Sequence, residues 1–161
     1  MDYRKEYEKW LASPALSEDE RAELRALEGN DKEIKARFYG PLEFGTAGLR
    51  GTMYTGLHNM NRHVIRWATQ GFANVIRAEG TEAMQKGVAV CMDCRNHSAE
   101  FARETACVMA ANGIHVRLFE SLRPTPELSF AVREYGCQAG VNVTASHNPK
   151  EYNGYKVYWE D

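Results

Sequence analysis

The residues best suited to chemistry gather near the C-terminal end of this sequence. Ser146, His147 and Lys156 supply a hydroxyl, an imidazole and an ammonium, and Arg50 is a candidate fourth member from a stretch rich in glycine, residues 43–60. A histidine next to the serine in sequence is poorly placed to act as its base, and no GxSxG pattern occurs, which argues against a serine hydrolase. Cations and amides around a hydroxyl suit the binding of a phosphate. The residues alone therefore predict an anion-binding site.

Alternating strands and helices must position these groups. Apolar runs at residues 88–93, 114–119 and 139–144 predict buried strands, and helices that begin near Ser98 and Thr125 connect them. Two such βαβ units imply three parallel strands with right-handed crossovers. A fourth strand, residues 155–159, follows the third after only a loop, so it must run antiparallel. We expect an α/β fold, a three-layer α/β/α sandwich with a mixed four-stranded sheet.

In such sheets, chemistry gathers at the carboxyl ends of the strands. The first predicted strand delivers Asp93, Arg95 and His97 to this edge, and the third delivers residues 144–149. The fourth strand starts at the same edge, which brings Lys156 back towards the serine. The two loops meet if their strands are neighbours.

The N-terminal part of the chain has a different character. Residues 1–40 predict a helical N-terminal arm, in which Ser17 and Glu20 form a capping box. Residues 43–60 show no clear period and are expected to form a loop. A long helix over residues 61–78 follows, with apolar residues at helical spacing.

Bulk properties narrow the class of protein. The 161 residues are 43% hydrophobic and 26% charged, and the formal net charge of -2 gives no electrostatic case for nucleic acid or an anionic membrane. No stretch approaches the length of a membrane span, and the first residues do not resemble a signal peptide. We expect one cytoplasmic domain with an appended arm.

The cysteines leave a different interpretation open. Cys91 and Cys94 have CxxC spacing, and His97 lies three positions further on, which is compatible with a redox pair or half a zinc site. A small thiol or zinc protein is therefore an alternative. Reduced, structural cysteines are favoured because no second CxxC occurs and Cys91 closes an apolar run.

Four motifs in order resemble those of the α-D-phosphohexomutases, the phosphoglucomutase/phosphomannomutase family. The sequence TASHNP at 144–149, followed by YNGYK at 152–156, is similar to the active-site signature of that family. FGTAGLRG at 44–51 resembles its N-terminal loop, and Asp93-x-Arg95 and RPTP at 123–126 stand where the family has them. The resemblance covers residues 41–161 as domain I, with a modest preference for the phosphoglucomutase/phosphopentomutase-like branch.

The resemblance implies roles for individual residues. Ser146 would carry the phosphoryl group and bind Mg²⁺ through a phosphate oxygen. Lys156 would assist proton transfer at the sugar hydroxyl, His147 would position groups or share in that transfer, and Arg50 would pair with phosphate. Support for the loop and the phosphate is expected from Thr144, Asn148, Gly48 and Gly51.

The resemblance also implies a function. Such mutases interconvert 1-phospho and 6-phospho (or 5-phospho) sugars through a bisphosphate intermediate, so a hexose or pentose phosphate and a glucose 1,6-bisphosphate-type activator are expected. We expect the metal loop and the sugar-reading loops in the remaining domains of the same enzyme, outside this sequence, and negligible turnover by these residues alone. The alternative is a non-catalytic phosphosugar-binding module.

Overall fold

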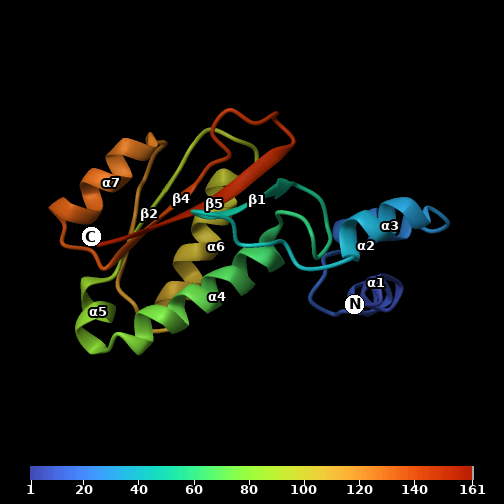
Figure 1. The fold of residues 1–161 in the computed structure, drawn as a ribbon, viewed down its shortest axis with the longest axis horizontal. Coiled ribbons are helices and arrows are strands. Elements are labelled where there is room, and N and C mark those ends of the chain that lie inside the picture. The colour runs from blue at the N-terminus through green and yellow to red at the C-terminus, as the bar shows by residue number, and fades with distance from the viewer. Residues whose placement is uncertain (161) are drawn as a thin grey trace.

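The computed structural model describes residues 1–160, which form an arm of short helices and an α/β unit (Figure 1). None of the helices in this range is long and apolar enough to cross a membrane. The helices are α1 (Tyr3–Leu11), α2 (Glu18–Arg25), α3 (Asp31–Phe38), α4 (Arg62–Ala78), α5 (Thr81–Lys86), α6 (Ser98–Ala111) and α7 (Thr125–Glu134). The strands are β1 (Gly48–Thr52), β2 (Val88–Met92), β3 (Val116–Leu118), β4 (Ala139–Val143) and β5 (Tyr152–Trp159).

The sheet has five strands in the order β1-β5-β4-β2-β3, not the four that we expected. Strands β3, β2 and β4 are parallel, and β5 is antiparallel to β4, as predicted. The additional strand, β1, lies within the stretch expected to be a loop and pairs antiparallel with β5. Its sequence GLRGT has one apolar residue between two glycines and so lacks the alternation by which strands are recognised.

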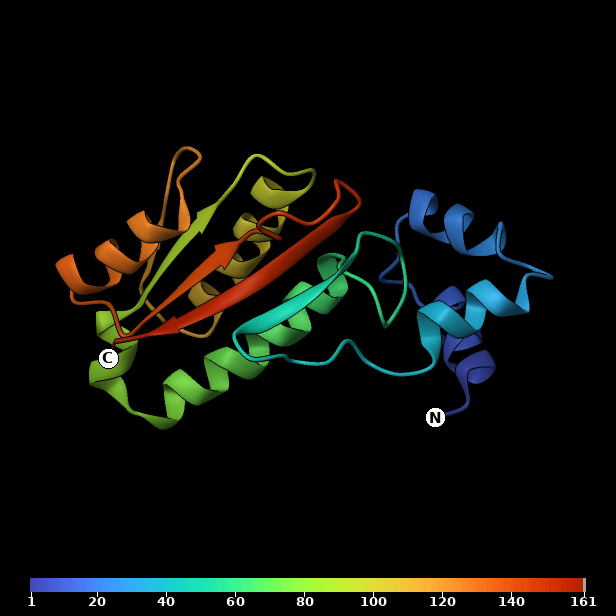
Figure 2. The ribbon, with the colours of Figure 1, turned by 45° about the horizontal axis from the view of Figure 1, so that its top comes forward.

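Helices cover both faces of the sheet, which gives the expected three layers (Figure 2). Val88 and Val90 of β2 belong to the core beneath α4 and α6. Ala89 and Cys91, which alternate with them, pack with Leu128 of α7 on the opposite face. Because β2 is covered on both sides, all of its residues are buried, and its sequence is a continuous apolar run.

The arm has a small core of its own and is joined to α4 by polar contacts. The predicted capping box is present, with Ser17 and Glu20 bonding each other's backbone N–H groups. The Glu20 carboxylate also accepts hydrogen bonds from Arg62, at 2.7 Å, and contacts His63, at 3.1 Å, in the first turn of α4. The arm core contains Leu57 from the segment between β1 and α4 and the following buried residues of the arm: Tyr7, Leu16, Leu24, Leu27, Ile34 and Phe38.

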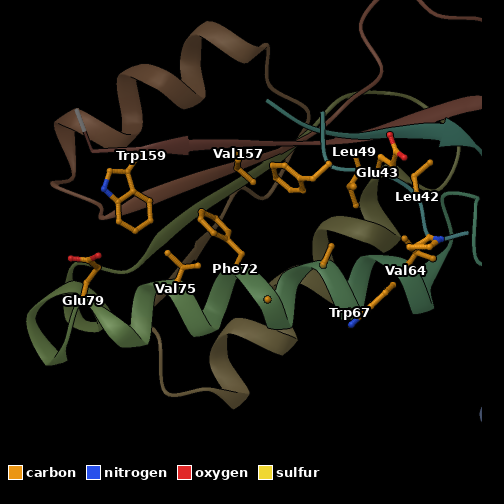
Figure 3. Close-up of a pocket in the computed structure, with 14 residues that line it drawn as sticks. Leu42, Glu43, Leu49, Val64, Trp67, Phe72, Val75, Glu79, Val157 and Trp159 are labelled. Atoms are coloured by element: carbon orange, nitrogen blue, oxygen red, sulfur yellow. The ribbon is translucent and has the colours of Figure 1, made fainter. Parts of the chain in front are cut away.

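An apolar groove of about 1100 Å³ runs between α4 and the β1–β5 edge of the sheet (Figure 3). Phe72 and Val75 of α4 point into it, opposite Val157 and Trp159 of β5. Since side chains alternate along a strand, these β5 residues lie on the opposite face of the sheet from Lys156. The groove is therefore separate from the predicted anion site.

Candidate functional site

The loop between β4 and β5 presents the predicted serine to solvent. Ser146 is exposed and has a left-handed backbone with φ of 56°, a conformation uncommon for residues other than glycine. Its N–H donates to Thr144 Oγ1 at 3.0 Å, and that hydroxyl donates to Asp93 Oδ2 at 2.5 Å. Asp93 follows β2, the neighbour of β4, so the two loops meet at the carboxyl ends of adjacent parallel strands as expected.

His147 lies beside the serine without a short hydrogen bond to it. Its Nδ1 is 3.4 Å from Ser146 Oγ, and the side chains of both residues are exposed. This separation is longer than an ordinary hydrogen bond to a hydroxyl. The geometry agrees with the sequence argument that adjacent residues make a poor nucleophile–base pair.

Strand β1 brings Arg50 to the loop that carries Ser146. The Arg50 Nη1 donates to Asn148 Oδ1 at 2.9 Å, which joins two residues 98 positions apart in the chain. Arg50 lies opposite Gly154 in the β1–β5 ladder. A Cβ on Gly154 would stand 2.5 Å from the Thr144 carbonyl oxygen and 2.9 Å from that of Leu49, so glycine is needed where the three strands converge.

The two glycines expected to support the loop flank Arg50 within β1. Gly48 has φ of +144°, and a Cβ there would stand 1.8 Å from the Tyr155 carbonyl oxygen. A Cβ on Gly51 would meet only side-chain atoms, those of Leu42 at 3.3 Å and of Met60 at 3.6 Å. Gly48 is therefore required for the close approach of β1 to β5, whereas nothing comparable constrains Gly51.

Lys156 lies within β5, opposite Asn142 of β4 and Gly48 of β1. Its position in the ladder puts it on the same face of the sheet as Arg50, and it is half-buried. The Asn142 side chain donates to Thr125 Oγ1 at 2.7 Å, and its own oxygen is buried with no hydrogen-bond partner among residues 1–160. Lys156 is thus carried by a strand that is paired on both sides, opposite a residue whose buried side-chain oxygen is unsatisfied.

Sequence reasoning placed Arg95 at this edge without recognising what it does. The Arg95 guanidinium lies inside the loop that follows β4 and binds backbone carbonyls there, including that of Ser146 at 2.7 Å. Asn153 adds a second support that was missed, because its amide donates to Ser98 Oγ at 3.0 Å and so ties β5 to the start of α6. The available signal was the Asp93-x-Arg95 pair directly after a strand.

The structure does not assemble the cysteines into a metal site. Cys91 is buried in the sheet, and burial raises the pKa of its thiol to about 12, whereas Cys94 is exposed. His97 instead pairs with Glu100, at 2.8 Å between Nδ1 and Oε2. Within residues 1–160 no group of three or more His, Cys, Asp or Glu side chains is arranged to hold a metal ion. The zinc interpretation has no support in this geometry.

A family model described as "Phosphoglucomutase/phosphomannomutase, alpha/beta/alpha domain I" matches residues 41–161. The chain belongs to this family. The matched residues of this phosphoglucomutase/phosphomannomutase domain contain the whole sheet and every predicted site residue, whereas the helical arm precedes them.

Individual relatives agree with the family match. A phosphopentomutase from Homo sapiens is 42% identical over 140 residues, which cover 83% of this chain and 23% of that protein. A phosphoglucomutase from Staphylococcus aureus is 41% identical over 132 residues, covering 82% of this chain and 23% of that protein. The chain thus spans about a quarter of the length of the curated relatives that it matches.

A solved structure shares the fold. A phosphoglucomutase/phosphomannomutase family protein from Burkholderia thailandensis superimposes with a TM-score of 0.62 at 27% sequence identity, covering 73% of this chain and 26% of that one. The sheet and its helices are therefore the arrangement of this family.

Proposed function

We propose that this chain is the phosphoserine-bearing domain of a sugar-phosphate mutase that interconverts 1-phospho and 6-phospho (or 5-phospho) sugars through a bisphosphate intermediate. The observation that carries the proposal is the presentation of Ser146. Its hydroxyl is exposed at a fixed, left-handed turn, and Arg50 is held at the same loop through Asn148. An exposed hydroxyl on a loop that also binds a guanidinium is suited to exchange a phosphoryl group.

The first half-reaction transfers the phosphoryl group from the enzyme to the sugar. The bond between phosphorus and Ser146 Oγ breaks as phosphorus bonds to a sugar hydroxyl oxygen, and that hydroxyl loses its proton. Lys156, on the same face of the sheet as Arg50, is the residue that we propose to assist this proton transfer. Arg50 compensates the charge of the phosphoryl oxygens through its planar donors.

The second half-reaction restores the enzyme. The sugar bisphosphate reorients, and its other phosphoryl group passes to Ser146 Oγ, while the proton returns to the sugar oxygen that is released. His147, beside the hydroxyl, is the proposed positioning group for the phosphoserine. Thr144 fixes the serine N–H throughout the cycle because it is itself held by Asp93.

Mg²⁺ fits this chain only in part. Both oxygens of Asp93 already accept hydrogen bonds, from Ser98 and Thr144, and no acidic cluster lies near the loop among residues 1–160. A phosphate oxygen on Ser146 is the one ligand that we assign to this chain. Bound there, the ion would neutralise charge on the transferring phosphoryl group. We propose that its other ligands and the sugar-reading loops belong to further domains, so these residues alone do not turn over.

The decisive experiment is phosphoryl loading of the full-length protein. After incubation with glucose 1,6-bisphosphate and Mg²⁺, intact mass and peptide mapping locate the added phosphate. We expect it on Ser146 alone, abolished by Ser146→Ala and unaffected by Ser121→Ala, a matched change at an exposed serine outside the site. If the wild-type protein binds the sugar phosphate but stays unlabelled, the mutase proposal is wrong and a phosphosugar-binding module replaces it.

A further inference from the structure

One arginine organises the backbone of the loop that carries the serine. Arg95 Nη1 donates to the carbonyl oxygens of Pro149, at 2.9 Å, and Tyr152, at 3.1 Å. Its Nη2 donates to those of Ser146, at 2.7 Å, and Asn148, at 2.6 Å. These four contacts use every hydrogen of the two terminal nitrogens. The loop from Ser146 to Tyr152 is therefore wrapped around a single guanidinium.

The guanidinium is itself held in place from β2. The Arg95 side chain is only 13% exposed, and its Nε lies 3.5 Å from Asp93 Oδ2. The Arg95 backbone N–H donates to Asp93 Oδ1 at 3.0 Å. The same carboxylate receives the hydroxyl of Thr144, which holds the Ser146 N–H. Asp93 thus holds the N–H of Ser146 through Thr144, while Arg95 binds the C=O of the same residue.

This double fixation explains an unusual backbone. Ser146 has φ of 56°, which residues with a Cβ adopt reluctantly because the Cβ crowds the carbonyl oxygen. Such a conformation persists only where the surroundings over-determine it. The Ser146 carbonyl bound to Arg95 and the Ser146 N–H bound to Thr144 supply those constraints. Arg95 also engages four carbonyl oxygens, which would repel a phosphate if they turned towards it.

We propose that Arg95 is the positioning residue of the phosphoryl-carrying serine. It acts through the backbone of residues 146–152, directs the Ser146 hydroxyl to the incoming phosphoryl group, and touches no substrate. The inference rests on the proposed function of Ser146. Lysine cannot replace Arg95, because an ammonium has three donors on one atom and cannot span four carbonyls in a plane.

The test measures the rate of Ser146 phosphorylation by glucose 1,6-bisphosphate in full-length Arg95→Lys and Arg95→Ala proteins. Arg103→Ala is the matched control, because Arg103 is an exposed arginine of α6 with no hydrogen bond or ion pair among residues 1–160. Both Arg95 variants are expected to lose on the order of 100-fold in rate, the effect of misplacing a reacting group by about 1 Å. Arg103→Ala should keep the wild-type rate.

Two further readouts separate positioning from a general loss of folding. Added guanidinium should restore part of the phosphorylation rate of Arg95→Ala but none of that of Arg95→Lys. In both variants kcat should fall while KM stays nearly constant. Hydrogen exchange at the amides of residues 146–152 should accelerate in Arg95→Lys and not in Arg103→Ala. A wild-type rate in Arg95→Lys overturns the inference.

The outcome for Arg95 is distinguishable from that for the proposed function. If wild-type protein takes up no phosphate, the proposed function fails. Hydrogen exchange then tests only whether Arg95 fixes the backbone of residues 146–152. Unchanged exchange in Arg95→Lys then refutes its role in setting the loop.

Discussion

Replacing Gly48 by alanine should detach the edge strand that carries Arg50. A Cβ at Gly48 would stand 1.8 Å from the Tyr155 carbonyl oxygen and 3.0 Å from Lys156 Cα, and these backbone atoms cannot swing aside as a side chain would. Alanine at φ of +144° adds backbone strain of about 1–3 kcal/mol. Loss of two ladder hydrogen bonds adds about 1 kcal/mol each, so the free energy of unfolding should fall by about 3–5 kcal/mol.

Gly51→Ala in the same strand is the matched control. Its Cβ would meet only side chains, Leu42 at 3.3 Å and Met60 at an ordinary contact distance of 3.6 Å, and its φ is accessible to alanine. We expect a change within about 0.5 kcal/mol, because reduced freedom of the unfolded chain offsets the small shift of Leu42. Urea unfolding followed by circular dichroism measures both variants. Equal stability of the two would refute the pairing of β1 with β5.

Three further predictions concern groups outside the serine loop. In the native protein Cys94 should react with a thiol reagent at about pH 8, whereas Cys91 should react only after denaturation, because burial raises its pKa to about 12. Burial also lowers the pKa of His63 below 6.5, despite the opposing Glu20. As the pH falls below the usual histidine pKa, His63 of the unfolded chain binds a proton that His63 of the folded chain does not, so stability is lost on acidification. His63→Gln should therefore flatten the dependence of Tm on pH between about 7 and 5. Tyr155→Phe should lower the free energy of unfolding by about 1–2 kcal/mol in urea titrations. The buried hydroxyl of Thr69 in α4 donates to the Tyr155 hydroxyl at 3.0 Å and would lose this acceptor. An unchanged midpoint would contradict this contact.

The sequence predicts the central part of the fold well, for a physical reason. Strands buried on both faces, such as β2, are continuous apolar runs, and the connections between them have clear helix starts and stops. Edge strand β1 has no such signature, because one face and one edge are open and its glycines are required by a partner far along the chain. Only the three-dimensional register reveals that Gly48 and Gly154 are needed where the strands converge.

The candidate site also contains residues that can be identified from the sequence and residues that cannot. Side chains with reactive groups, such as Ser146 and Lys156, can be singled out from the sequence together with a family resemblance. The contribution of Arg95 could not be, because its partners are backbone carbonyls, which every residue has and no sequence pattern marks. The sequence places Lys156 at the start of a strand over residues 155–159. In the structure β5 begins at Tyr152, so Lys156 lies further inside the ladder, opposite Asn142.

The β1–β5 pairing has a consequence for the order of folding. Arg50 and Asn148 are 98 positions apart, so during synthesis the arginine leaves the ribosome long before its partner exists. Local βαβ segments can form earlier at a lower entropic cost of loop closure. We therefore expect the edge strand to be added late, after β4 and β5 have formed. The candidate anion site would then be completed by the last major step of folding, and partly folded chains would present the serine without the guanidinium of Arg50.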